Sequence, residues 1–227
     1  IKLLSVKRDK IEDCIDNMVG CLQVAERIID STKYIFINEY AAAEEYIAAK
    51  IRSVVDNNIP FMPISLVELK FVESKLNINF DQKQIDAVNE AMNSGIFVLT
   101  GGPGTGKTTT LNAIIEILKS RDKSIALAAP TGRAAKRMTE LTGFDAKTIH
   151  RLLEVEWSEN DQPYFSKNKK NPLDYDVIII DEMSMVDTLL FRSLLEAVRT
   201  TSRLILVGDS DQLPSVGAGN VLGDIID

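Results

Sequence analysis

The sequence predicts an α/β fold in which a parallel-sheet domain over residues 80–227 follows a small all-helical region over residues 1–79. Two observations lead to this prediction. Short, continuous apolar runs alternate with helical segments through the second region, and the first region has no such series of runs. Buried apolar strands separated by helices are typical of a parallel sheet that is covered on both faces.

The N-terminal region carries helical signals. Apolar residues recur at helical intervals over residues 9–29 and 39–55, and the second segment is rich in alanine. Pro60 interrupts the pattern, and Ser65 with Glu68 three residues later predicts a capping box at the start of a further short helix. Nothing in this region indicates catalytic chemistry.

The second region alternates between the two periodicities. Asp81 is expected to cap a helix that continues to Met92. Strands are predicted at 96–99, 124–129, 177–180 and 204–207, and helices at 107–120, 133–141 and 188–198. The pattern lapses into polar residues over about 154–173, where we expect an inserted hairpin or small subdomain. Trp157 and Phe165 could stack on bases there, but packing within the hairpin is favoured.

Composition bounds the class of protein. Of the 227 residues, 45% are hydrophobic and 26% are charged, which is typical of a globular protein. The net charge of −7 does not indicate nucleic-acid binding by the whole surface, although a basic stripe on one face would suffice for it. Cys14, Cys21 and the single histidine, His150, do not have the spacing of a zinc site, so the cysteines are expected to be reduced and buried.

No apolar run approaches the length that spans a bilayer, so we expect a cytoplasmic protein without a membrane partner. The chain starts at Ile1 and stops at Asp227 within the strand–helix pattern, from which we expect it to be part of a longer protein.

A phosphate-binding loop follows the strand predicted at 96–99. Residues 101–108 read Gly-Gly-Pro-Gly-Thr-Gly-Lys-Thr, which matches the phosphate-loop pattern at each required position, between a strand and a helix. Backbone N–H groups of such a loop converge on phosphate oxygens at a helix N-terminus. Lys107 would reach the β and γ phosphates of ATP, and the Thr108 hydroxyl would bind Mg²⁺. The loop residues predicted to bind ATP are Gly102, Pro103, Gly104, Thr105, Gly106, Lys107, Thr108 and Thr109.

A second acidic motif ends the strand predicted at 177–180. Asp181 and Glu182 follow four apolar residues. In phosphate-loop enzymes the first such carboxylate helps to hold Mg²⁺, and the next one can activate water against the γ phosphate. A strand that ends in two acids is by itself often a solvated edge, but the phosphate loop upstream favours the functional interpretation.

Four motifs then resemble a known family. Residues 206–214, Leu-Val-Gly-Asp-Ser-Asp-Gln-Leu-Pro, resemble motif III of superfamily 1 helicases. Residues 129–137, 148–153 and 181–187 resemble the RecD-like group (RecD/TraA type) of 5′-to-3′ DNA helicases, which act in DNA repair and recombination. The resemblance covers about 80–227 and implies a RecA-like P-loop NTPase domain, the first motor domain of such a helicase.

The resemblance also implies individual roles. Gln212 would sense the γ phosphate, which completes a catalytic set with Lys107 and Glu182. Gln84 stands where the family has an adenine-reading glutamine, although a solvated helix glutamine is the alternative and Gln82 lies close by.

Single-stranded DNA is the expected macromolecular partner. Residues 131–151 hold five basic residues against two acidic ones, a local excess that suits phosphate contacts in an acidic chain. The DNA-binding residues predicted are Thr131, Arg133, Thr148 and His150. For His150 a structural hydrogen-bonding role is an equal alternative.

Helicases of this group close their ATP site with a second motor domain, which is expected to lie beyond Asp227. We therefore expect a monomer that binds ATP but has little turnover and no unwinding activity on its own. The first alternative is a nucleotide-regulated DNA-binding module with a lapsed ATPase. The intact residues of the site argue against it: Lys107, Thr108, Asp181, Glu182 and Gln212. The second is a small-molecule phosphotransferase, in which residues 208–214 have no evident role.

Overall fold

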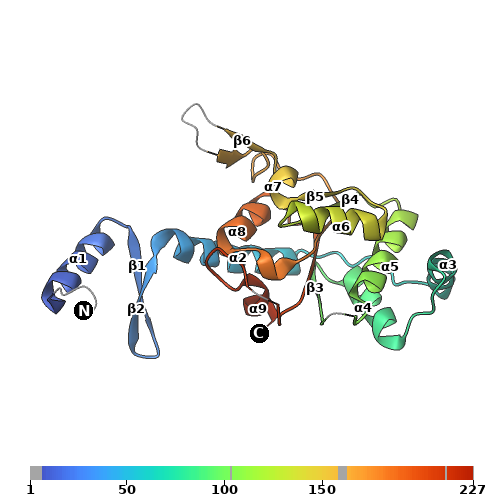
Figure 1. The fold of residues 1–227 in the computed structure, drawn as a ribbon, viewed down its shortest axis with the longest axis horizontal. Coiled ribbons are helices and arrows are strands. Elements are labelled where there is room, and N and C mark those ends of the chain that lie inside the picture. The colour runs from blue at the N-terminus through green and yellow to red at the C-terminus, as the bar shows by residue number, and fades with distance from the viewer. Residues whose placement is uncertain (1–6, 103, 158–162, 213, 227) are drawn as a thin grey trace. The chain divides into compact units, whose positions relative to one another are not determined.

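The computed structural model describes residues 7–102, 104–157, 163–212 and 214–226. The chain divides into two compact units, Ile1–Ala48 and Ala49–Asp227. Figure 1 shows the elements of each unit along the chain. This division differs from the domain boundary predicted between residues 79 and 80. That boundary separates regions of different predicted function, and it stays a prediction.

The first unit holds a helix and a β-hairpin. Helix α1 (Arg8–Gly20) precedes strands β1 (Val24–Ile29) and β2 (Thr32–Ile37), which pair antiparallel from Val24 opposite Ile37 to Ile29 opposite Thr32. Asp30 and Ser31 form the turn with φ values of +47° and +64°. Positive φ at both turn residues is the geometry that matches the twist of a two-residue hairpin.

The hairpin corrects the prediction of an all-helical N-terminal region. The helix expected over 9–29 ends at Gly20, because the β-branched residues that follow favour an extended chain. An Asp-Ser turn is a weaker hairpin signal than Asn-Gly or Asp-Gly, so the sequence pattern missed it. The prediction of buried cysteines was also wrong, since Cys14 and Cys21 are free and exposed.

Helix α2 (Asn38–Asp56) runs from the first unit into the second, where α3 (Leu66–Leu76) and α4 (Gln82–Asn93) follow. Both predicted caps are present. The Ser65 and Asp81 side chains accept hydrogen bonds from the N–H groups of Glu68 and Gln84, whose own side chains bond back to the cap N–H groups. These capping boxes satisfy donors that a helix start otherwise leaves unpaired.

A parallel sheet forms the centre of the second unit. Its strand order is β3–β9–β8–β4–β5, and every neighbouring pair is parallel. The strands are β3 (Ile96–Thr100), β4 (Ile125–Ala129), β5 (Ala146–Thr148), β8 (Val177–Ile180) and β9 (Arg203–Gly208). Strands β8 and β9 are buried along their whole length, as continuous apolar runs in a doubly covered sheet should be. The α/β fold class with a parallel sheet is therefore confirmed.

Helices cover the sheet. They are α5 (Lys107–Ser120), α6 (Gly132–Thr142), the short α7 (Ile149–Leu152), the 3₁₀ turn η1 (Met183–Met185), α8 (Thr188–Ala197) and α9 (Val221–Ile226). The main core forms where α4 and α5 pack on the strands, around Val88, Ile114 and Ile179. Within the described ranges, no helix has the length and apolar character needed to cross a membrane.

The predicted insertion is a hairpin, formed by β6 (Val155–Trp157) and β7 (Pro163–Phe165). Its connecting residues lie outside the described ones. Trp157 is 68% exposed, so the expectation that it packs within the hairpin was wrong. Phe165 lies beside His150, with ring centroids 5.8 Å apart.

Candidate nucleotide-binding site

A cavity of about 480 Å³ lies at the carboxyl ends of β3, β8 and β9. The loop after β3 forms one wall, and the residues that follow β8 and β9 form the next. Helix α6 closes the remaining side with Ala134, Arg137 and Leu141. Crevices at the carboxyl ends of parallel strands are the usual ligand sites of α/β folds.

Glycines give the phosphate loop its shape. Gly104 and Gly106 have φ values of +78° and +86°, a region that residues with a Cβ rarely enter. The Thr105 hydroxyl donates to the Gly102 carbonyl at 2.9 Å. The Lys107 ammonium donates to the carbonyls of Gly101 and Gly102, so the basic group lies folded over the loop that it is predicted to serve.

The loop residues predicted to bind ATP meet at the cavity. Its lining includes Gly102, Gly104, Thr105, Gly106, Lys107, Thr108 and Thr109. Pro103 lies outside the described residues. Thr108 and Thr109 stand in the first turn of α5, where free N–H groups and the helix dipole favour an anion.

Asp181 and Glu182 line the same cavity as the phosphate loop. Glu182 has φ +55° and ψ +43°, a left-handed conformation that costs a residue with a Cβ about 1–2 kcal/mol. Burial raises the pKa of the Asp181 carboxyl. The Glu182 N–H and the nearby cations Arg137 and Lys107 lower this pKa, but by less than burial raises it. Burial and then the Asp181 carboxylate raise the pKa of Glu182, which suits a group that must accept a proton near neutral pH.

A magnesium ion fits this donor set. The Thr108 hydroxyl and the Asp181 carboxylate face the same cavity, and oxygen ligands are those that Mg²⁺ prefers. Among the residues that the structure describes, no cluster of three or more metal-binding side chains is present. A cation held here would therefore complete its shell with water or with phosphate oxygens of a nucleotide.

Gln212 reaches the cavity from the loop after β9. Its amide nitrogen lies 3.5 Å from Oδ2 of Asp209, whose Oδ1 accepts from the Asp211 N–H at 3.1 Å. Asp209 is only 3% exposed, and its buried carboxylate accepts from both residues of this loop.

Gln84 does not line the cavity. Its side-chain oxygen accepts from the Asp81 N–H at 3.1 Å in the capping box. Its amide nitrogen faces the phosphate loop from outside, because a Cβ built on Gly106 would lie 2.8 Å from it. Gln82 instead donates to Asp86.

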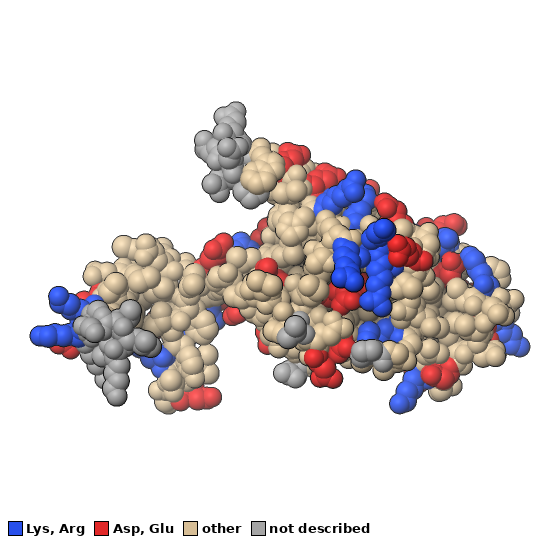
Figure 2. Space-filling model, viewed as in Figure 1, with Lys and Arg blue, Asp and Glu red and all other residues tan. Residues whose placement is uncertain are grey.

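The residues predicted to bind DNA gather at the ends of β4 and β5. Thr131 and Thr148 cap α6 and α7 by accepting from the N–H groups of Ala134 and Arg151. Ala129 pairs with Thr148 in the sheet, so the two helix starts lie on neighbouring strands. Figure 2 shows Lys and Arg side chains over the part of the molecule where α6 and α7 lie in Figure 1.

Arg133 and His150 are exposed beside these caps. The structure thus brings the four predicted residues to one edge of the sheet. The Thr131 and Thr148 hydroxyls already accept one hydrogen bond each from a helix start, which leaves the hydroxyl hydrogen free to donate.

Arg137 is a cavity residue that sequence reasoning missed. It was counted only within the basic stretch 131–151. Helical spacing from the Thr131 cap carries the missing signal, since Ala134, Arg137 and Leu141 recur on one face of α6.

A parallel sheet whose first strand enters a glycine-rich loop, with paired carboxylates after a nearby strand, defines a phosphate-loop nucleotide-binding domain. The chain belongs to the AAA domain family, whose model matches residues 84–218.

Curated relatives confirm the resemblance to RecD-like helicases. The chain is 43% identical to the RecBCD enzyme subunit RecD of Mycolicibacterium smegmatis, over 64% of this chain and 30% of that protein. It is 42% identical to the ATP-dependent RecD2 DNA helicase of Deinococcus radiodurans, over 65% of this chain and 20% of that protein. The RecD subunit of Mycobacterium tuberculosis is 35% identical over 86% of this chain and 36% of its own length. The chain thus spans between 20% and 36% of these relatives.

Among solved structures, a Pif1 helicase from Bacteroides in complex with ADP-AlF₃ and ssDNA is 26% identical. The match covers 65% of this chain and 37% of the Pif1 chain, and the TM-score is 0.43.

Proposed function

We propose that this chain is the ATP-binding motor portion of an ATP-dependent DNA helicase of the RecD type, with 5′-to-3′ polarity. The observation that carries the proposal is the meeting of Lys107, Thr108, Asp181, Glu182 and Gln212 around one cavity. The relatives named as RecD subunits and as an ATP-dependent DNA helicase support the same activity. A role in DNA repair or recombination, in the cytoplasm, goes with that proposal.

Different residues of the site bind the phosphates, accept the proton and hold the metal ion. The Lys107 ammonium and the N-terminus of α5 hold the β and γ phosphates by charge and by N–H donors. Glu182 accepts a proton from the attacking water, and Gln212 contacts the γ phosphate. Thr108 and Asp181 hold Mg²⁺, which supplies positive charge to the phosphate oxygens when bound. Gln84 reads the adenine from its place beside Gly106.

Single-stranded DNA would lie along the starts of α6 and α7. Thr131, Arg133, Thr148 and His150 contact the DNA backbone, which suits a motor that moves along any sequence. A second motor domain of the same polypeptide completes the ATP site and supplies an arginine, an effect worth about 10³ to 10⁵ in rate. The chain alone, as a monomer, then binds ATP with little turnover.

The first test is calorimetric titration of Mg·ATP into this chain, into Lys107→Ala and into Lys119→Ala. Lys119 is a matched control, because it is the same residue type on the same helix but stands in the last turn. We expect binding by the wild type and the control, and its loss in Lys107→Ala.

Phosphate release with and without single-stranded DNA follows. Negligible release in both cases supports the need for a second domain, and DNA-stimulated release by this chain contradicts it. A change in nucleotide affinity on addition of DNA, with no turnover after the second domain is restored, would favour the nucleotide-regulated DNA-binding module.

A further inference from the structure

Helix α6 forms a wall of the nucleotide cavity on one of its faces only. Ala134, Arg137 and Leu141 line that cavity. Ala135 and Thr139, on another face, line a separate depression of about 400 Å³. Of the three α6 residues at the nucleotide cavity, Arg137 is the one that carries charge.

In the described part of the chain, the Arg137 guanidinium acts by charge on the Asp181 and Glu182 carboxyls, whose pKa values it lowers. No hydrogen bond or ion pair engages its side chain there, whereas its neighbour Lys136 lies 3.9 Å from Glu140. Asp181 and Glu182 line the same cavity without forming an ion pair with it. An exposed arginine on the wall of a phosphate-binding cavity, with its N–H donors unused by the described residues, is suited to an anionic ligand.

The ligand chemistry follows from the neighbours. The cavity is bounded by the phosphate loop, by Lys107 and by the carboxylates after β8, so the end of a polyphosphate lies nearest to these groups. A guanidinium presents a planar fork of N–H donors that matches two phosphate oxygens, which a lysine cannot do.

We propose that Arg137 binds the terminal phosphate of ATP from within this domain and thereby distinguishes ATP from ADP. This inference rests on the proposed function, since it assumes that ATP is the ligand of the cavity. Its consequence is mechanical. Helix α6 begins at Thr131 and Arg133, the predicted DNA contacts, and reaches Arg137 within two turns. Loss of the terminal phosphate would remove the Arg137 contact from the helix whose first turn holds the predicted DNA contacts.

The test compares Mg²⁺ complexes of a non-hydrolysable ATP analogue and of ADP by calorimetry. The proteins are the wild type, Arg137→Ala, Arg137→Lys and Lys136→Ala. Lys136→Ala is the matched control, because this substitution also removes one positive charge from α6, and Lys136 does not line the nucleotide cavity. Thermal unfolding of each variant reports whether the fold is retained.

We expect Arg137→Ala to weaken the ATP analogue about tenfold or more, and ADP by less than about twofold. Arg137→Lys should restore part of the loss, and Lys136→Ala should bind both nucleotides like the wild type. Equal losses for the analogue and ADP, or no loss for either, would overturn the inference.

The proposed function fails differently. If the wild type bound neither nucleotide, or if Lys107→Ala bound both as well as the wild type does, both proposals would fall. Lys107-dependent binding with an unchanged ratio of ATP-analogue to ADP affinity in Arg137→Ala would overturn the role of Arg137 alone.

Discussion

Gly106 stands at the residue where the phosphate loop becomes helix α5. Its φ of +86° lies in the left-handed region, and a Cβ there would meet the Gln84 amide at 2.8 Å. The Gly106 carbonyl also accepts from the Thr110 N–H and hydroxyl. A side chain at position 106 would therefore meet two obstacles, a strained backbone and the Gln84 amide next to its Cβ.

Gly106→Ala should distort the loop and move Gln84. The left-handed conformation alone costs an alanine about 1–2 kcal/mol. We expect nucleotide affinity to fall about tenfold or more and the unfolding temperature to fall by several degrees, at about 2–4 °C for each kcal/mol in a domain of this size. Calorimetry and thermal unfolding measure both effects.

Gly132→Ala is the matched control for that substitution. Gly132 is the first residue of α6, has no positive φ, and a Cβ there meets nothing within 4 Å. Alanine at such a helical site should be neutral or stabilising by up to about 1 kcal/mol. Wild-type nucleotide affinity in Gly106→Ala would contradict the importance of this close approach.

Single-residue roles could be predicted where chemistry is local in the sequence. The capping residues Ser65 and Asp81 bond to neighbours within three positions, so spacing identified them, and the glycine-rich loop joins a strand to a helix as predicted. Arg137 was missed because its role depends on which face of α6 meets a cavity built from three other segments. Helical spacing puts Ala134, Arg137 and Leu141 on one face of α6, but it does not tell which segments that face meets.

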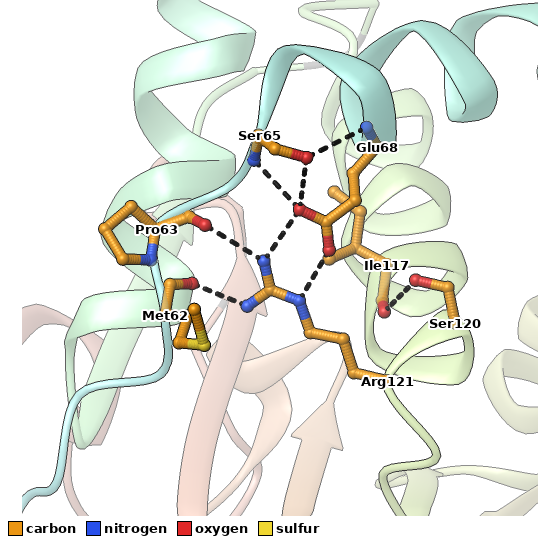
Figure 3. A network of polar contacts seen from close by, with 7 residues as sticks. All are labelled: Met62, Pro63, Ser65, Glu68, Ile117, Ser120 and Arg121. Carbon is orange, nitrogen blue, oxygen red and sulfur yellow. Dashed lines mark hydrogen bonds and ion pairs between the residues drawn. The ribbon is translucent and has the colours of Figure 1, made fainter.

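At the scale of elements, one ionic network ties α3 to the end of α5. Figure 3 shows Arg121 between Glu68 and the carbonyls of Met62 and Pro63. Its Nε and Nη2 lie 2.9 and 3.2 Å from the two Glu68 carboxylate oxygens, and Nη1 donates to the Met62 carbonyl at 2.6 Å. Two-point pairing of this kind is the strong form of an ion pair. It joins the end of the helix that follows the phosphate loop to the start of α3 and to residues 62 and 63 before it.

The network predicts a pH-dependent stability. Arg121 first, and then the Ser65 N–H, lower the pKa of Glu68 from 4.5 to about 2. A carboxyl whose pKa falls on folding stabilises the fold above its unfolded pKa, and that contribution disappears as the pH drops toward the folded value. Glu68→Gln should therefore cost about 1–2 kcal/mol at pH 7, discounted for partial exposure.

Denaturant unfolding of the wild type and Glu68→Gln between pH 7 and pH 2 checks this. The difference in unfolding free energy should be constant down to about pH 5 and then shrink toward zero. Glu73→Gln would control for loss of an acid on the same helix, apart from its bond to the Phe80 N–H. A difference that stays constant down to pH 2 would contradict the assigned pKa.

Elements could be predicted where burial fixes their pattern. The strands predicted at 96–99, 177–180 and 204–207 agree with β3, β8 and β9 to within a residue, because each is a continuous apolar run, and β8 and β9 are buried along their whole length. Strand β5 was not predicted. It has three residues, Ala146–Thr148, and only its partner β4 makes it a strand.

At the scale of the whole molecule, the nucleotide cavity belongs to one unit. All its lining residues lie between Gly102 and Gln212, within Ala49–Asp227. Removal of residues 1–37, which keeps α2 intact, should therefore leave nucleotide affinity within about twofold of the wild-type value. Calorimetry on the shortened chain measures it, and a loss comparable to that in Lys107→Ala would show that the first unit acts on the site.

The negative charge of the whole chain bears on how DNA binding depends on salt. A net charge of −7 repels DNA, so binding must depend on the local basic residues of the stretch 131–151. For single strands, the logarithm of affinity falls with the logarithm of salt by about 0.7 for each phosphate contact. Arg133→Ala should then reduce the slope by about 0.7 and weaken binding to all sequences alike.

Arg52→Ala is the control, because it removes the same side chain from an exposed position on α2 and causes the same change in net charge. Fluorescence anisotropy with labelled single-stranded DNA over a series of salt concentrations gives both slopes. If Arg133→Ala and Arg52→Ala changed the slope equally, binding would reflect overall charge, and the DNA face proposed at the starts of α6 and α7 would be wrong. If only Arg133→Ala changed it, the phosphate contact belongs to the helix that also carries Arg137 into the nucleotide cavity.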